Sequence, residues 1–191
     1  MLTTVKPDVI VPDTSPLIHL AAVNALSILN RLGSVVLADM VVYEATADLS
    51  KPWAPEIAAW IAEGQREGSN APVTVETTET GETFRLALQT DPSHRAPNAG
   101  EVAIVEWLAE KIEDTTTEAL VVYENGKVPR VIAQQGMNAN IAVVTTRALL
   151  QLAELQGIIP SAENLWQKIE AAVPTVNPAI RVNIQRPTGK P

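Results

Sequence analysis

The stretch VIVPDTSPLIHL, residues 9–20, places an acid where an apolar run stops and a helix begins. The apolar run is short and rich in β-branched residues, which favours a buried strand. Ser15 followed by Pro16 is typical of a helix start, with the capping side chain first and proline at the first helical position. Asp13 therefore falls at a corner between a strand and a helix, and an acid at such a corner needs an explanation.

Short apolar runs alternate with helical patterns along the rest of the chain. Further buried strands are predicted near residues 35–37, 72–76, 119–123 and 141–144. The segments between them carry apolar residues at helical spacing, and the first helical segment is expected to break near Asn24. Strands that alternate with helices form parallel sheets covered by helices on both faces. We therefore expect one α/β domain over residues 1–173, a three-layer αβα arrangement with a central sheet of about five parallel strands.

The composition limits the chemistry that the chain can perform. Its 191 residues include no cysteine, which excludes thiol nucleophiles and zinc–thiolate sites. The two histidines, His19 and His94, lie far apart in the sequence, and the apolar neighbours of His19 favour a structural role for it. The N-terminus lacks the pattern of a signal peptide, and no apolar run approaches the roughly 20 residues of a membrane span. A cytoplasmic protein without membrane contact is expected.

The net charge of -8 argues against a surface that binds polyanions in general, because such surfaces are rich in lysine and arginine. The C-terminal residues 174–191 differ, since they hold Arg181, Arg186 and Lys190 and no acid. Their prolines and lack of periodicity are typical of an extended, flexible tail. A local basic edge is therefore compatible with the acidic total.

Polar residues follow three of the predicted strands. Asp13 ends the first strand, Glu124 the fourth, and Thr145 with Thr146 the fifth. In open parallel sheets the ligand site lies beyond the carboxyl ends of the strands, where the strand order reverses. These residues are therefore expected to converge on one site.

Several uses of an α/β sheet are excluded by the residues around Asp13. The turn lacks the glycines of a dinucleotide-binding loop or a P-loop, because no glycine precedes Gly33. Ser15 stands where an aspartyl phosphatase usually has a second acid, and the last strand is followed by Thr145-Thr146-Arg147 without the lysine of a receiver domain. A nucleotide-binding α/β protein of another kind stays open. A carboxylate site for Mg²⁺ or Mn²⁺ is favoured, since such ions prefer oxygen ligands and can activate water against a phosphodiester.

Four sequence features together resemble the PIN-domain ribonucleases, especially the VapC-like toxins of bacterial toxin–antitoxin pairs. They are Asp13-Thr14-Ser15-Pro16-Leu17-Ile18, Glu44 in the helix after the second strand, Gly100-Glu101 at a helix start, and the polar pair Glu124-Asn125. The resemblance covers roughly residues 8 to 170. It implies a strand order of 3-2-1-4-5, a Mg²⁺ or Mn²⁺ site, cleavage of single-stranded RNA, and a cognate antitoxin protein as partner.

The resemblance also assigns roles to individual residues. The implied catalytic acids are Asp13, Glu44, Glu101 and Glu124, of which all but Glu44 would bind the metal ion. The implied supporting residues are Ser15, Asn125, Thr145 and Thr146, and Arg130 and Arg147 could meet RNA phosphate. The family usually has two aspartates where this chain has Glu124-Asn125, so metal binding could be weaker or differently placed here.

Each acid also has a purely structural interpretation. Asp13 could cap the first helix, and Glu101 could form a capping box with Asn98 three residues before it. Glu44 suits a helix start through the helix dipole, and Glu124 could belong to a turn.

Two functions are therefore carried forward. One is a metal-dependent endoribonuclease held in check by an antitoxin, and the other is a catalytically weak PIN-fold module that binds RNA or a partner protein. The sequence leaves open whether Trp53 and Trp60 belong to a homodimer face or to an antitoxin groove.

Overall fold

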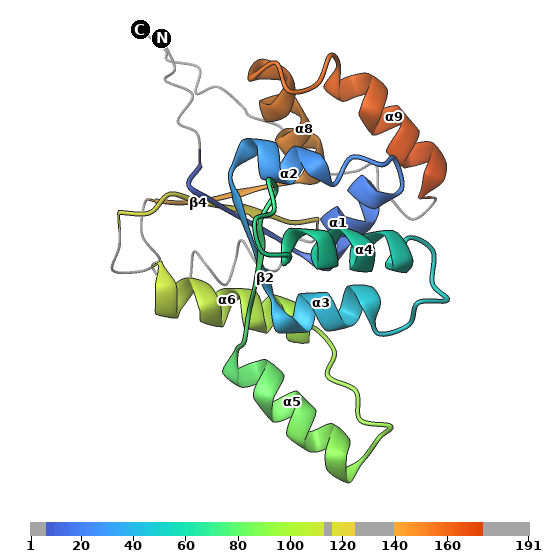
Figure 1. The fold of residues 1–191 in the computed structure, drawn as a ribbon, viewed down its shortest axis with the longest axis vertical. Helices are drawn as coiled ribbons and strands as arrows, with labels where there is room; N and C mark the ends of the chain where they lie inside the picture. The colour runs from blue at the N-terminus through green and yellow to red at the C-terminus, as the bar shows by residue number, and fades with distance from the viewer. Residues whose placement is uncertain (1–6, 113–115, 125–139, 174–191) are drawn as a thin grey trace, which may run out of the picture.

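The structure is a computed structural model that describes residues 7–112, 116–124 and 140–173 (Figure 1). Asn125, Arg130 and the tail predicted at 174–191 lie outside the described residues.

Five parallel strands form one sheet in the described part of the chain. They are β1 (Val9–Pro12), β2 (Ser34–Ala38), β3 (Val73–Glu76), β4 (Ala119–Val122) and β5 (Ile141–Val144). Their order is β3-β2-β1-β4-β5, and each neighbouring pair is parallel. The order reverses between β1 and β4, so these two strands flank the switch point. The predicted fold class and strand order are confirmed.

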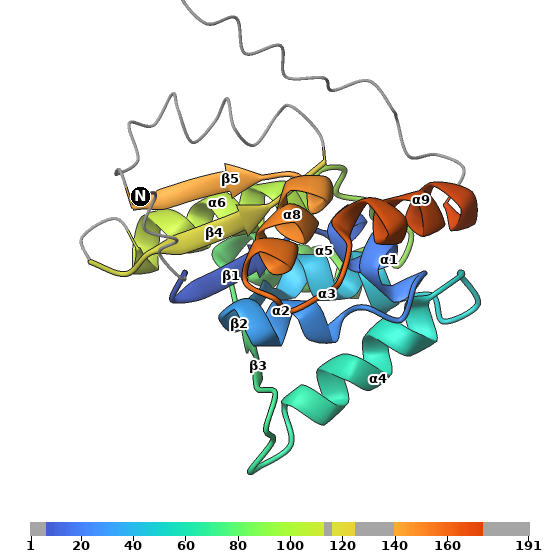
Figure 2. The same cartoon turned by 90° about the horizontal axis from the view of Figure 1, so that it is seen from above.

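The helices connect and cover these strands. Their bounds are α1 (Thr14–Ala21), α2 (Ser27–Leu32), α3 (Asp39–Thr46), α4 (Ala54–Gly64), α5 (Glu79–Thr90), α6 (Ala99–Lys111), α8 (Thr146–Leu155) and α9 (Ala162–Ala172). Figures 1 and 2 show α2, α8 and α9 on one side of the sheet and α3 with α6 on the other. The predicted break between α1 and α2 is confirmed, and Asn24 within it has a positive φ of 55°.

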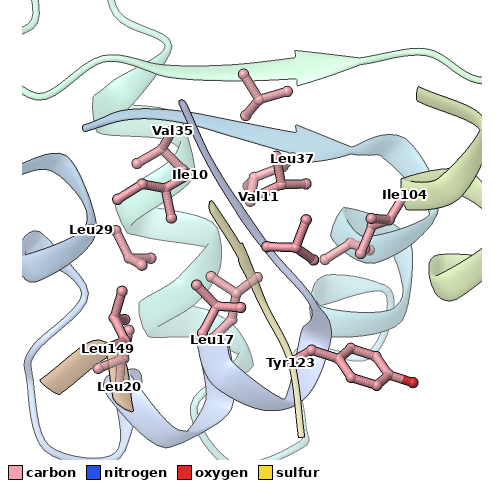
Figure 3. Close-up of a cluster of buried hydrophobic side chains, with 14 of the residues drawn as sticks. Ile10, Val11, Leu17, Leu20, Leu29, Val35, Leu37, Ile104, Tyr123 and Leu149 are labelled. Atoms are coloured by element: carbon pink, nitrogen blue, oxygen red, sulfur yellow. The ribbon is translucent and has the colours of Figure 1, made fainter. Parts of the chain in front are cut away.

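The core lies on both faces of the central strands. Consecutive residues of β1 point to opposite faces, as the pleat of a strand requires. Figure 3 shows Ile10 directed toward Leu29 of α2, whereas Val11 lies on the side of Ile104 from α6. All three side chains named from β1 and α6 are at most 1% exposed. Burial on both faces explains why β1 and β4 are unbroken apolar runs in the sequence.

The fifth strand was predicted to be buried, and this prediction is wrong. β5 is an edge strand, and its residues are partly covered or exposed rather than buried. A run of four apolar residues therefore does not distinguish an edge strand from a central one. No helix among the described residues combines the length and the apolar composition that a bilayer crossing requires.

Candidate active site

The candidate site lies beyond the carboxyl ends of β1, β4 and β5. In the register of the sheet Pro12 pairs with Val122, so Asp13 is adjacent to the end of β4. The Asp13 backbone N–H donates to the Val122 carbonyl at 2.9 Å, and Tyr123 continues the pairing toward Val144 at 2.8 Å. The predicted convergence of strand ends is confirmed.

Asp13 is the most buried acid of this group and is 5% exposed. Helix α1 begins at Thr14 with Asp13 as its N-cap residue, so the predicted start with Ser15 as the cap is wrong. The Asp13 side chain makes no capping hydrogen bond, and no side chain of the described residues donates to it. The capping interpretation therefore does not account for this carboxylate.

The surroundings of Asp13 disfavour its charge. Burial raises the pKa of its carboxyl group to about 7, against a usual value of 3.8, although the Thr14 backbone N–H lowers it. The negative charges of Glu44, Glu101 and Glu124 raise this pKa further. All four predicted acids thus lie within electrostatic range of one another. A bound cation would reverse this effect, because it stabilises ionised carboxylates.

Glu44 of α3 joins the starts of two other helices. Its Oε2 accepts a hydrogen bond from the Thr14 hydroxyl at 3.0 Å, and its Oε1 accepts one from the Gly100 backbone N–H at 2.9 Å. A Cβ at position 100 would lie 2.8 Å from Glu44 Oε2, so any other residue there would force the Glu44 carboxylate to shift. Because both oxygens already accept a hydrogen bond, Glu44 is better suited to positioning than to direct metal binding.

The capping box predicted for Asn98 and Glu101 is not formed. Asn98 adopts a left-handed conformation with φ of 63°, and its side chain makes no capping hydrogen bond to α6. Glu44 supplies the capping oxygen from another helix. Glu101 therefore does not take part in the predicted reciprocal cap.

Tyr123 holds Glu101 from the end of β4. Its hydroxyl donates to Glu101 Oε1 at 2.9 Å, while its side chain is buried with 2% exposure. Sequence reasoning missed this residue, although a tyrosine directly after a buried strand was a usable signal. Buried tyrosine hydroxyls usually have a partner. The second oxygen of Glu101 accepts no hydrogen bond from the described residues.

Glu124 faces His19 and the start of α8. Its Oε1 accepts a hydrogen bond from the Thr146 backbone N–H at 2.8 Å and lies 3.6 Å from His19 Nδ1. His19 Nδ1 is also 3.4 Å from Thr146 Oγ1. Burial raises the pKa of Glu124, but His19 and Thr146 outweigh it and hold the pKa below its usual value. His19 is thus a structural partner of a predicted site acid.

The remaining predicted residues are placed as follows. Thr145 Oγ1 accepts from the Ala148 backbone N–H at 3.2 Å and caps α8, while Ser15 makes no hydrogen bond with its side chain in the described part of the chain. Arg147 pairs with Glu163 at 2.7 Å, and its guanidinium carbon lies 5.9 Å from the centre of the Trp166 ring.

The carboxylate oxygens of the site suit a hard divalent cation, but they do not form a complete set of ligands around one position. The described residues hold no group of three or more His, Cys, Asp or Glu side chains arranged around a common metal position. Mg²⁺ does not require one, because it is commonly held by one or two carboxylates, with waters and substrate phosphate as further ligands. The buried carboxylate of Asp13 and the second oxygens of Glu101 and Glu124, which accept no hydrogen bond from the described residues, are the available donors.

Comparison with protein-family models finds none that matches this chain. Comparison with curated proteins likewise finds no similar sequence. The geometry of the site therefore has to carry the functional argument.

Proposed function

We propose that this chain is a metal-dependent endoribonuclease of the PIN-domain type, which cleaves single-stranded RNA and acts in the cytoplasm as the toxin of a toxin–antitoxin pair. The main support is Asp13, a buried carboxylate without a side-chain partner in the described residues, whose pKa of about 7 reflects burial beside three glutamates. An isolated buried anion costs free energy unless a cation or hydrogen bonds compensate it. A divalent ion is the compensation that this donor set suits.

Each residue of the site has a distinct proposed role. Asp13 and Glu101 would hold Mg²⁺ or Mn²⁺, which when bound activates a water and offsets charge on the phosphate. Tyr123 orients Glu101, and Glu44 fixes the starts of α1 and α6 against each other. Glu124, kept ionised by its hydrogen bonds, would position the attacking water or offer its second oxygen to the ion.

The cleavage of a labelled single-stranded RNA tests this proposal. The purified protein should cut the RNA with Mn²⁺ present and should stop when the metal is chelated. Asp13→Asn should abolish cleavage, whereas Glu63→Gln, at an exposed acid paired with Arg66, should cut as the parent does. Identical purification of the variants excludes a contaminating nuclease. An Asp13→Asn protein as active as the parent would refute the role of Asp13 in catalysis.

Tyr123→Phe tests the positioning of Glu101. The change removes one hydroxyl and keeps the buried ring, so the free energy of unfolding should fall by only about 1 kcal/mol. The affinity for Mn²⁺, measured by calorimetry, should fall by roughly tenfold, as is usual when a partner that orients a metal ligand is lost. An unchanged affinity would show that the Tyr123 hydroxyl does not position a metal ligand.

A catalytically weak PIN-fold module is the second candidate. It is favoured by Glu124, which replaces the family's usual aspartate and is held by Thr146 and His19. Such a module would bind RNA, an antitoxin or a second copy of the chain without cutting. Calorimetric titration separates the two candidates, because a chain that binds no Mn²⁺ at millimolar concentration is a module and not a metal-dependent nuclease.

A further inference from the structure

A cavity of about 670 Å³ opens next to the acid cluster. Its walls come from α3, from the segment after α3, from α5 and from the segment that joins α5 to α6. The lining includes Tyr43, Glu44, Lys51, Phe84 and Arg95. The volume falls within the roughly 300–1,000 Å³ of small-ligand sites, so it can hold one nucleotide.

A partly exposed aromatic ring lines this cavity and packs against a buried one. Tyr43 is 40% exposed, whereas Phe84 beneath it is 5% exposed. The two rings meet edge to face, with centroids 4.8 Å apart and an angle of 65° between their planes. The packing holds Tyr43 in place while part of its surface stays open. Single-stranded nucleic acids use such rings to stack their bases.

Two cationic side chains, Lys51 and Arg95, line the same cavity as Tyr43. Arg66, Arg85, Lys111 and Arg147 each pair with a carboxylate within 4.0 Å. Lys51 and Arg95, like Arg31 and Lys168, have no such pairing with any described residue, although the charge of Lys51 acts on Asp48 and that of Arg95 on Asp91. Arg95 Nη1 donates to the carbonyls of Ser93 and His94, both at 3.0 Å, which orients the guanidinium group. Two exposed cations that line the cavity without a carboxylate within 4.0 Å can each contact a phosphate there.

Two acids, Glu44 and Asp48, also line the cavity. Both oxygens of Glu44 accept hydrogen bonds from Thr14 and Gly100. Asp48 accepts two from Ser50, both on Oδ1, and these, together with the charge of Lys51, lower the pKa of its carboxyl group. Glu44 also belongs to the acid cluster around Asp13. A ligand in the cavity therefore lies beside the proposed catalytic acids.

We infer that this cavity is a nucleotide subsite of the proposed nuclease, in which one base of a single-stranded RNA stacks on Tyr43 and the adjoining phosphates meet Lys51 and Arg95. The subsite would seat a nucleotide next to the bond that is cut and contribute to the choice of cleavage position. The inference rests on the proposed function for its ligand. A segment of a protein partner is the alternative occupant, and the experiment below distinguishes it.

Binding without metal tests the subsite separately from cleavage. Fluorescence anisotropy of a labelled ten-nucleotide RNA of mixed sequence, with a chelator present, measures affinity while the RNA stays intact. Tyr43→Ala and Arg95→Gln should each weaken binding at least about fivefold. Tyr43→Phe keeps the ring and should recover most of the affinity. Arg66→Gln is the matched control, because this exposed arginine does not line the cavity and pairs with Glu63.

Salt dependence identifies the phosphate contact. Loss of one such contact should reduce the slope of log affinity against log salt concentration by about one in Arg95→Gln. Arg95 is exposed, so this variant should fold as the parent does even if Tyr43→Ala does not. Unchanged RNA affinity in both Arg95→Gln and Tyr43→Ala overturns the subsite and leaves the protein segment as the occupant.

The two proposals fail in distinguishable ways. A parent protein that binds RNA through these residues but never cuts it with Mn²⁺ refutes the nuclease and supports the subsite. A parent that cuts RNA while both variants retain its affinity and its KM refutes the subsite alone.

Discussion

Replacing Asp13 by asparagine should stabilise the metal-free protein above pH 7. The folded state raises the pKa of Asp13 from 3.8 to about 7, mainly through burial. This difference corresponds to about 4 kcal/mol of unfolding free energy once the group is ionised in both states. Asparagine has nearly the same shape, can accept the Thr14 backbone N–H and carries no charge. It therefore removes this cost without leaving a cavity.

The sign of the pH dependence follows from proton uptake. Between about pH 4 and pH 7 the folded protein holds a proton on Asp13 that the unfolded chain has released. The contribution of this group to stability is thus complete near pH 4 and declines as the pH rises toward 7. The advantage of Asp13→Asn should be near zero at pH 4 and reach its full size at pH 8. For a chain of this length it corresponds to roughly 8–16 °C in Tm.

Unfolding by heat and by urea, in a chelator and from pH 4 to pH 8, measures this effect. Asp48→Asn is the control, because its carboxylate is exposed and its pKa is lowered, so no gain is expected there. Mn²⁺ should raise the Tm of the parent by mass action and leave Asp13→Asn unchanged. A variant that is no more stable than the parent at pH 8 would refute the argument that Asp13 is buried as an uncompensated acid.

Two further changes test the neighbours of Asp13. Gly100→Ala adds a Cβ that would lie 2.8 Å from an oxygen of Glu44, so urea unfolding should show a loss of about 1–3 kcal/mol, and a stability equal to the parent's would mean that Glu44 can withdraw without cost. His19→Phe removes the nitrogen beside Glu124, so the pKa of Glu124 should rise and the acid limb of the pH–rate profile for RNA cleavage should move to higher pH; a profile that stays in place would separate His19 from the chemistry.

The fold class could be predicted from the sequence, because the residue patterns that indicate strands and helices lie within short segments. Unbroken β-branched runs such as 9–11 predict strands buried on both faces, and helical spacing between them predicts a parallel sheet. Gly157 follows α8 with a positive φ of 69°, and a glycine in this conformation is a common local signal for the end of a helix. The strand order came from the resemblance to PIN-domain ribonucleases, and the structure has that order.

The candidate site could be predicted only in part from such patterns. Asp13, Glu124 and Thr145 could be named because each follows a strand, and parallel strands bring their carboxyl ends to one edge of the sheet. The half-exposed β5 was not foreseen, because the position of a strand at the edge of a sheet is a property of the assembled fold.

Only the tertiary structure decided what each acid contacts. Glu44 caps a helix that begins 55 residues later in the chain, a role that local spacing had given to Asn98. Tyr123 reaches Glu101, and His19 lies beside Glu124 across more than a hundred positions. Hydrogen bonds and burial depend on distance in space, which residue spacing does not encode. The sequence by itself determined that an acid stands at the end of β1, whereas the packed fold determined that this acid is buried, unpartnered by side chains in the described residues, and costly to ionise.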